Sequence, residues 1–459
     1  MNRSTVRKSV SVIVALVLCS GFPSWCQPSG IRISDDYEIE DVRVLPQDMR
    51  TYASSFSDGS LTPVCRDAFL PDFMRNYYSP WRDTVPYSPI ADAVRTMREH
   101  AQNVWYGDNR RKVPPVRLQQ LLANCDLEHL PSLNRAAIAL FPSAMRVLPT
   151  TSPFLKKADD FPFDALQNAA VTMNEPLRVL HASADGLWLF VKGADTSGWV
   201  ESRDVGYISE SQAGEWMKKE QIVVVNDVTL LRDGKGEVIR KVRLGTLLPR
   251  VGEDESSYTV TVAMPSDGHG VRMLTARVPK ESARRFPLEL NRENVAMVGN
   301  QLLGKPYGWG GMYLNRDCSS MIRDFYLPFG IWLPRGSYNQ IHSGDPVSLA
   351  GLTPNEKERL LREKGVPFLT LVHLNGHIML YIGNINGRPL VFHSLWKVSI
   401  RDGEGDVSKH VIGKSIISTL TPGSEFNLAS GTLLQKVRSI LVLSDCPASR
   451  AQGSKEGRR

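Results

Sequence analysis

The sequence predicts an α+β protein built of several units, and three observations carry this prediction. Apolar residues at helical spacing recur within residues 27–140, whereas short, turn-bounded segments of alternating polarity fill residues 141–287. From Asn291 onward, helical and strand-like patterns are mixed in one stretch. A chain of 459 residues is also long enough for about two to four globular units.

Composition excludes several classes of protein. With 42% hydrophobic and 22% charged residues, the chain has the apolar content of a folded protein rather than a disordered one. No stretch of about twenty apolar residues follows the N-terminus, so we expect no transmembrane helix in the mature chain. The formal net charge of +7 is small and scattered, which argues against a nucleic-acid partner.

Residues 1–26 have the pattern of an export signal. Basic residues precede an apolar core that is too short to span a bilayer, and small residues follow the core. We therefore expect an exported protein that is periplasmic or associated with the cell envelope. Lipid attachment at Cys19 or Cys26 is the alternative, but the large residues Leu18 and Trp25 directly before them disfavour it.

The cysteines beyond the leader are too few and too scattered for a disulfide framework; they are Cys65, Cys125, Cys318 and Cys446. A single bridge between Cys65 and Cys125 is possible in an oxidising compartment. No CxxC pair is present, so we expect neither a structural zinc site nor another metal or cofactor.

Three units are expected before the domain that contains the candidate catalytic residues. Residues 27–140 predict a helical scaffold, with helices over 88–107 and 116–130 where apolar residues recur at helical spacing. Residues 141–208 and 209–287 each predict a small β-barrel, because each block holds several short strands separated by turns. Neither block gathers residue types suited to catalysis, so we interpret both as binding or positioning modules.

Residues 288–445 are predicted to form the domain that contains the candidate catalytic residues. Asn291 is placed to cap its first helix, and Gly304 and Pro306 are placed to end that helix. The last residues, 446–459, are polar and predict a disordered tail.

Cys318 is the candidate nucleophile. The segment GKPYGWGGMYLNRDCSSMIRDFY (304–326) predicts a tight, aromatic-walled loop that enters a helix near Asp317 or Cys318. In the first turn of a helix, unpaired backbone N–H groups and the helix dipole stabilise a thiolate, so we expect a lowered pKa for this thiol. A thiolate is the attacking form of cysteine. A buried structural cysteine is the alternative, and the neighbouring residues decide between the two.

Three histidines lie in the strand-like segment PFLTLVHLNGHIMLYIGNINGRPLVFHSLW (367–396). A nucleophilic cysteine needs an imidazole that exchanges protons with it, and that imidazole needs a partner that fixes its tautomer. His377, directly after an Asn-Gly turn, is the candidate base, and His393 is the candidate partner. A two-residue turn pairs His373 with Ile378 and directs His373 to the opposite face, so we interpret His373 as structural.

The register of the next hairpin bears on the pairing of His377 with His393. An even-length turn at Asn386-Gly387 places the two histidines on opposite faces of the sheet, whereas a loop of three or five residues places them on one face. We therefore predict an odd-length loop that carries a bulge. Zinc bound by Cys318, His377 and His393 is the rival use of these residues, disfavoured because no further carboxylate or histidine stands at ligand spacing.

Four motifs follow one another in the C-terminal domain: YGWGG…DCSS, LPRGSYNQ (333–340), GHIMLYIG (376–383) and FHSLW (392–396). Their order resembles the NlpC-type cell-wall cysteine peptidases. The upstream sequence, with YYSPW (77–81), is similar to the branch of that family with an N-terminal stabilising segment and two bacterial SH3-like barrels. With these units the resemblance covers nearly the whole mature chain.

This resemblance implies a papain-like catalytic fold and hydrolysis of peptidoglycan stem peptides. Such enzymes cleave the amide between the γ-carboxyl of D-glutamate and the following diamino acid, usually meso-diaminopimelate. The resemblance makes Cys318 the nucleophile, His377 the base and His393 the residue that orients the base. Ser320 stands where the family often has glycine, and because its side chain is small we expect no loss of activity.

The same resemblance implies contacts with the substrate. Tyr307 matches a tyrosine that lines the site and, with the Cys318 backbone N–H, helps to stabilise the oxyanion. Asp317 and Ser319 match positions that hold the free amino terminus of L-Ala, although Asp317 serves equally well as a helix cap. Arg335 neutralises a substrate carboxylate or, as the alternative, forms a structural ion pair.

We therefore expect an exported, monomeric γ-D-glutamyl-L-diamino acid endopeptidase that acts on stem peptides with a free L-Ala amine. We also expect the barrels to close one end of the substrate cleft and so to restrict the enzyme to short peptides. A CHAP-type N-acetylmuramoyl-L-alanine amidase, which also uses Cys and His but cuts the sugar–peptide bond, is one alternative. A non-catalytic wall-binding protein is the other, and the intact Cys318, His377 and His393 argue against it.

Overall fold

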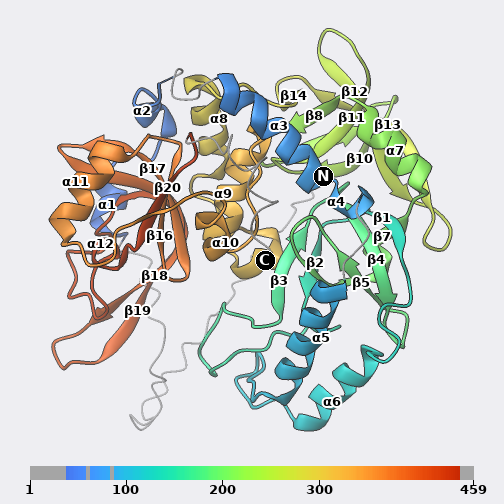
Figure 1. The fold of residues 1–459 in the computed structure, drawn as a ribbon, viewed down its shortest axis with the longest axis horizontal. Coiled ribbons are helices and arrows are strands. Elements are labelled where there is room, and N and C mark those ends of the chain that lie inside the picture. The colour runs from blue at the N-terminus through green and yellow to red at the C-terminus, as the bar shows by residue number, and fades with distance from the viewer. Residues whose placement is uncertain (1–37, 58–62, 83–86, 445–459) are drawn as a thin grey trace, which may run out of the picture.

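The computed structural model describes residues 38–57, 63–82 and 87–444 (Figure 1). The predicted leader (1–26) and the predicted polar tail (446–459) lie outside the described residues. Among the residues that are described, no helix combines the length and the apolar character needed to cross a membrane.

Helices dominate the N-terminal segment, as the spacing of apolar residues predicted. They are α1 (Glu40–Val44), α2 (Met49–Ala53), α3 (Pro63–Tyr77), α4 (Ser79–Arg82), α5 (Tyr87–Gln102) and α6 (Pro115–Asn124). The last of them ends short of the predicted residue 130, because Asp126 has a positive φ of 45° that no α-helix accommodates. Cys125, its C-cap, is a buried free thiol, so the bridge from Cys65 is not formed.

The first barrel is a seven-stranded antiparallel sheet of order β3-β2-β6-β5-β4-β1-β7. The strands are β1 (Arg135–Ala139), β2 (Ser143–Arg146), β3 (Gln167–Val171), β4 (Pro176–Ala182), β5 (Trp188–Lys192), β6 (Ser197–Glu201) and β7 (Val205–Tyr207), with a 3-10 turn η1 (Ser202–Asp204). The sheet begins before residue 141, because β1 pairs with both β4 and β7. Helices α5 and α6 cover it through an apolar cluster that contains Trp188 and Trp199.

The second barrel has the order β10-β9-β13-β12-β11-β8-β14 and is preceded by α7 (Glu210–Lys218). Its strands are β8 (Gln221–Val224), β9 (Thr229–Arg232), β10 (Val238–Val242), β11 (Leu247–Glu253), β12 (Ser257–Pro265), β13 (Val271–Pro279) and β14 (Ala283–Arg285). The two barrels lie on the same side of the molecule in Figure 1, next to the helices of the C-terminal domain.

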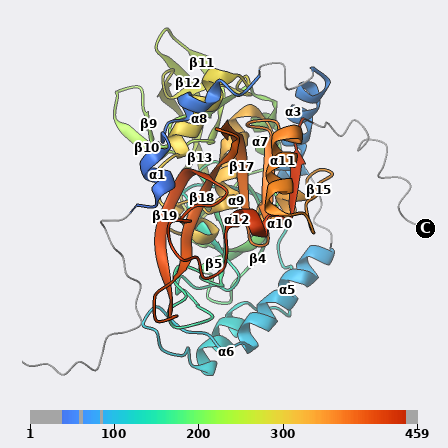
Figure 2. The ribbon, with the colours of Figure 1, turned by 90° about the vertical axis from the view of Figure 1, so that its left-hand side faces the viewer.

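The C-terminal domain packs helices against both faces of a six-stranded sheet of order β15-β20-β16-β17-β18-β19 (Figure 1, Figure 2). The helices are α8 (Arg292–Leu302), α9 (Cys318–Tyr326), α10 (Ser337–Ile341), α11 (Pro354–Lys364) and α12 (Leu433–Lys436), with 3-10 turns η2 (Trp309–Leu314) and η3 (Leu327–Phe329). The strands are β15 (Val347–Ser348), β16 (Thr370–Leu374), β17 (His377–Ile385), β18 (Arg388–Arg401), β19 (Val407–Thr419) and β20 (Ser439–Val442). These units together confirm the predicted α+β class.

The predicted ends of the first two helices of this domain are confirmed. The Asn291 side chain accepts a hydrogen bond from the backbone N–H of Asn294 and so caps α8. That helix ends at Leu302, just before Gly304 with its positive φ of 73°. The Asp317 carboxylate caps α9, so Cys318 is the first residue of that helix.

The two hairpins of the sheet set the faces of the histidines. In the first, His373 pairs with Ile378, as predicted. In the second, the prediction of an odd-length loop is wrong, because Ile385 pairs with Arg388 across a two-residue turn. A β-bulge inside β17 changes the register instead, since Tyr381 pairs with Val391 but Gly383 pairs with Leu390.

This bulge turns His393 to the face of His377. Beyond it Leu380 pairs with Phe392, and because side chains alternate along a strand, His377 and His393 then project from the same side. Gly383 supplies the positive φ of 122° that the bulge requires. The predicted bulge therefore exists, but it lies in the strand rather than in the loop.

The N-terminal segment holds the bulge from outside. The Ser55 hydroxyl lies 2.7 Å from the carbonyl oxygen of Ile382, the extra residue of the bulge. Phe56 follows it and is buried with 1% exposure, its ring packing edge-on to that of Phe368. The apolar cluster around them also contains residues of both barrels and of the C-terminal domain, so this core joins the N-terminal segment to those three units.

We expect Phe56→Ala to lower the apparent melting temperature by several degrees, because a buried aromatic side chain truncated to alanine costs about 3–5 kcal/mol. Val44→Ala is the matched control, since Val44 lies in the same segment with 62% exposure and should change little. Thermal denaturation followed by circular dichroism measures both variants. Equal melting temperatures for Phe56→Ala and the unmodified protein would contradict this role of the segment.

Candidate active site

Cys318 lies where the aromatic loop meets the first turn of α9. The Asp317 side chain accepts a hydrogen bond from the backbone N–H of Ser320 at 2.8 Å, which fixes the start of the helix. Met321, Ile322 and Phe325 are buried on the inner face of that helix. Cys318 itself is only 7% exposed, and the backbone N–H of Ile378 donates toward its sulfur, so the thiol lies against the strand that begins with His377.

The expected lowering of the Cys318 pKa is wrong for this structure. Burial raises the pKa of the thiol to about 12, and the charge of Asp317 next to it acts in the same direction. Backbone N–H groups of Ile378 and Ser319 stabilise the thiolate, as expected at a helix start, but they do not outweigh these two effects. The resting cysteine is therefore a neutral thiol.

His377 and His393 form a hydrogen-bonded pair on one face of the sheet. Nε2 of His377 lies 2.8 Å from Nδ1 of His393, and Nε2 of His393 lies 2.9 Å from the Ser418 hydroxyl oxygen. Burial lowers the pKa of His377 to about 4, so the imidazole is neutral at physiological pH. Burial likewise holds the pKa of His393 well below its usual range, with the neighbouring His377 adding to the effect.

His373, in contrast, lies on the other face of the hairpin. Its Nδ1 is 3.4 Å from the hydroxyl of Ser439 on β20. The structure therefore separates it from the pair, as the sequence predicted.

The arrangement of the pair bears on the zinc alternative. The two nitrogens that face each other, His377 Nε2 and His393 Nδ1, share one hydrogen bond and so do not point at a common third position. Among the described residues, no group of three or more His, Cys, Asp or Glu side chains is arranged to hold a metal ion.

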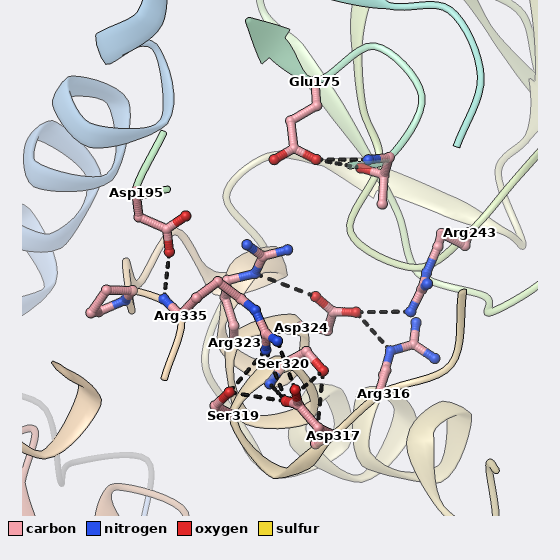
Figure 3. A network of polar contacts seen from close by, with 12 residues as sticks. Glu175, Asp195, Arg243, Arg316, Asp317, Ser319, Ser320, Arg323, Asp324 and Arg335 are labelled. Atoms are coloured by element: carbon pink, nitrogen blue, oxygen red, sulfur yellow. Dashed lines mark hydrogen bonds and ion pairs between the residues drawn. The ribbon is translucent and has the colours of Figure 1, made fainter. Parts of the chain in front are cut away.

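The Asp317 carboxylate binds Arg335 through two parallel contacts, of 2.9 and 2.7 Å (Figure 3). Burial opposes ionisation, but the Arg335 guanidinium outweighs it and holds the pKa of Asp317 well below its usual range. Arg335 also donates to the Ser319 hydroxyl at 2.9 Å. Of the alternatives for Arg335, the structure therefore contains the ion pair, and Asp317 is a helix cap.

Tyr307 and Trp396 form an aromatic wall near the thiol, with ring centroids 5.7 Å apart. Burial raises the pKa of the Tyr307 phenol well above its usual range, and the nearby Cys318 raises it further. The phenol is therefore protonated and can donate a hydrogen bond. Phe161 of the first barrel packs edge-on to Trp396 at 6.1 Å.

The first barrel contacts the loop that precedes Cys318 at several points. The Trp309 indole N–H donates to the Asp164 carbonyl at 3.0 Å, and the Gln167 amide donates to the Gly310 carbonyl at 2.9 Å. At Gly311, whose φ is +85°, a Cβ would lie 2.6 Å from that of Ala170. Only glycine permits this close approach, which explains the paired glycines of the motif.

A second group of charges holds the same loop to the second barrel. Arg316, which precedes Asp317, contacts Asp324 and Asp227, each at 2.6 Å. Arg243 of the second barrel donates to Asp324 at 3.0 Å and to the Leu314 carbonyl at 2.6 Å. Figure 3 shows Arg243, Arg316 and Asp324 close to the Asp317–Arg335 pair at the start of α9. Both barrels therefore position the segment that ends at the thiol.

Three residues near the site were missed by the sequence reasoning. Ser418 contacts His393, and Asp195 of the first barrel accepts a hydrogen bond from the Arg335 backbone N–H. Ser55 binds the bulge. Ser55 and Asp195 belong to elements far away in the chain, whereas Ser418 lies on the strand that follows that of His393. No local motif in the sequence marks any of the three.

Family models match four parts of the chain. Residues 9–130 match the NLPC_P60 stabilising domain, 152–201 an SH3 domain of SH3b1 type, 209–255 an SH3 domain of SH3b2 type, and 304–413 the NlpC/P60 family. No curated protein matches the chain.

A solved structure of high similarity shares the fold of this chain. An NlpC/P60 endopeptidase from Photobacterium damselae subsp. piscicida is 23% identical, with a TM-score of 0.77 over 87% of this chain and 98% of that chain. An NlpC/P60 family protein from Bacillus cereus is 18% identical, with a TM-score of 0.40 over 60% of this chain and 81% of that chain. The chain belongs to the NlpC/P60 family of peptidases, in the branch in which a stabilising domain and two SH3 domains precede the NlpC/P60 domain.

Proposed function

We propose that the protein hydrolyses the γ-D-glutamyl–diamino acid amide of peptidoglycan stem peptides, with Cys318 as the nucleophile. The observation that carries this proposal is the thiol at the start of α9, placed against the strand of a hydrogen-bonded histidine pair within an NlpC/P60 domain. The protein acts as an exported monomer, with residues 1–26 as its signal peptide, in the periplasm or cell envelope.

His377 serves as the general base in this mechanism. Because the resting thiol and imidazole are both neutral, the Cys318 proton moves to His377 as the sulfur attacks the γ-carbonyl carbon. The imidazolium then protonates the departing amine of the diamino acid, and a thioester to D-glutamate is left. Water activated by His377 attacks the thioester, which releases the acid and returns the proton to the sulfur.

The oxyanion that forms at the carbonyl is stabilised by two donors. One is the backbone N–H of Cys318, at the positive end of the α9 dipole. The other is the Tyr307 phenol, which remains protonated because burial raises its pKa.

Short stem peptides with a free L-Ala amine are the proposed substrates. Asp317 and Ser319, which flank the nucleophile, bind the amine, and Arg335 keeps the Asp317 carboxylate ionised for it. The first barrel closes one end of the cleft, because Phe161 lies on Trp396 and Asp195 reaches Arg335.

We expect Cys318→Ala to lower hydrolysis of the tripeptide L-Ala-γ-D-Glu-diaminopimelate by at least a thousandfold, because the acyl-enzyme route needs the sulfur. Cys125→Ala is the matched control, since Cys125 is also a buried free thiol but lies directly after α6, away from the site. Mass spectrometry of the products measures both. Full activity in Cys318→Ala would exclude the thiol mechanism.

The pH dependence follows from the lowered pKa of the base. The reactive form needs neutral His377, and because burial lowers its pKa to about 4, kcat/KM should fall only as the pH drops toward 4. An unperturbed imidazole would give this fall near pH 6.5. Initial rates at low substrate between pH 3 and 8 measure the acidic limb, and a midpoint near 6.5 would contradict a buried neutral base.

The substrate class is tested with three samples: the free tripeptide, its N-acetylated form and intact crosslinked sacculi. We expect cleavage of the free tripeptide at the γ-D-Glu bond and a loss of at least tenfold on acetylation, because acetylation removes the positive charge of the amine. Sacculi should be cleaved more slowly still. Products in which the intact peptide is separated from muramic acid would indicate an amidase. Equal rates on sacculi and on the tripeptide would contradict a cleft that the first barrel closes at one end.

A further inference from the structure

Ser418 ends a chain of hydrogen bonds that begins at the proposed base. His377 Nε2 lies 2.8 Å from His393 Nδ1, and His393 Nε2 lies 2.9 Å from the Ser418 hydroxyl oxygen. Both His393 and Ser418 have an exposed fraction of 0%. Water therefore does not supply alternative partners for these groups, and the protons along the chain must be arranged by the protein itself.

The position of each hydrogen along the chain follows from the contact between the Ser418 hydroxyl and the Thr419 carbonyl. The Ser418 hydroxyl donates its one hydrogen to the Thr419 carbonyl oxygen at 2.7 Å, so its oxygen can only accept from His393. His393 thus carries its hydrogen on Nε2 and has a bare Nδ1, which accepts the hydrogen of His377 Nε2. The remaining nitrogen of His377, Nδ1, has the free lone pair that can accept a thiol proton.

We propose that Ser418 is a positioning residue that fixes the tautomers of both histidines. The reverse arrangement would place hydrogens on His393 Nδ1 and His377 Nδ1. In that state His377 has no lone pair toward the nucleophile and cannot take its proton. The reverse arrangement is also disfavoured because it leaves the buried Ser418 oxygen without a hydrogen-bond donor.

The backbone that carries Ser418 is held from both sides by the N-terminal segment. The Gln47 amide exchanges two hydrogen bonds with the backbone of Ile417, at 2.9 and 3.0 Å. The Asp41 carboxylate accepts from the backbone N–H and the hydroxyl of Thr419, at 2.9 and 2.8 Å.

Ser418 needs this support because β19 is the edge strand of the sheet, with β18 as its neighbouring strand. On its outer side, residues 304–307 pair with residues 413–415, before Ser418 is reached. Edge strands have unpaired backbone groups on their outer side. Gln47 and Asp41 pair with these groups directly before and after Ser418. The N-terminal segment thus acts on the candidate site through β19, the strand that carries the Ser418 hydroxyl.

The kinetic test compares Ser418→Ala, Ser418→Thr and Ser439→Ala. Ser439 is the matched control, because its hydroxyl faces the structural His373 on the same sheet. We expect Ser418→Ala to lower kcat for the tripeptide by about tenfold to a hundredfold with KM within twofold, the size of a lost buried hydrogen bond. Ser418→Thr, which keeps a hydroxyl, should recover most of the rate, and Ser439→Ala should match the unmodified protein.

A second measurement does not need the proposed activity on which the kinetic test rests. Long-range ¹⁵N–¹H correlation spectra of histidine-labelled protein report which ring nitrogen carries each hydrogen, and His377→Ala and His393→Ala assign the two signals. We expect hydrogens on Nε2 of both residues in the unmodified protein and a mixture of tautomers in folded Ser418→Ala. Gln47→Ala should show a smaller change in the same direction.

These outcomes separate the inference from the proposed function. If the unmodified protein does not cleave the tripeptide but shows both Nε2 hydrogens, the proposed function fails and the tautomer assignment stands. A hydrogen on His377 Nδ1 in the unmodified protein overturns the inference. Unchanged kcat in Ser418→Ala overturns it as well, and if that variant does not fold, the spectrum of the unmodified protein decides.

Discussion

The candidate site depends on a one-residue shift in the register of two strands. The turn between β17 and β18 has an even length and by itself would set His377 and His393 on opposite faces. The extra residue Ile382 reverses this, so the pair exists only because the strand is irregular there. A bulge interrupts the ladder and must be stabilised by something else, and Ser55 supplies a partner for the freed carbonyl.

Burial determines the charge state of the site. Taking a thiol and two imidazoles out of water penalises the charged form of each, so the pKa of Cys318 rises while those of the histidines fall. Two full charges act on the candidate nucleophile in opposite directions, because Asp317 raises the pKa of the thiol and Arg335 lowers it. In the proposed mechanism the proton is therefore transferred during the attack rather than before it. The direction of that transfer depends on which nitrogen of His377 lacks a hydrogen.

Much of the fold and of the candidate site follows from the sequence. Residues close together in the chain, such as Asp317 with Cys318 or His373 with Ile378, obey local rules of capping and turn geometry, and the structure agrees with them. The bulge was inferred only from the need to align two histidines, and its position could not be found because nothing marks Ile382 locally. The pKa of Cys318 was mispredicted because the helix dipole is visible in a sequence, whereas burial is not.

The parts outside the NlpC/P60 domain have different tasks at this site. The barrels fix the loop before Cys318 through contacts at Gly310 and Leu314, so they act on the nucleophile's side. The N-terminal segment contacts Ile382 and the strand around Ser418, so it acts on the side of the histidines. The thiol and the imidazole pair come from different elements and meet only if both sides are held, which is why segments far away in the chain converge on one catalytic domain.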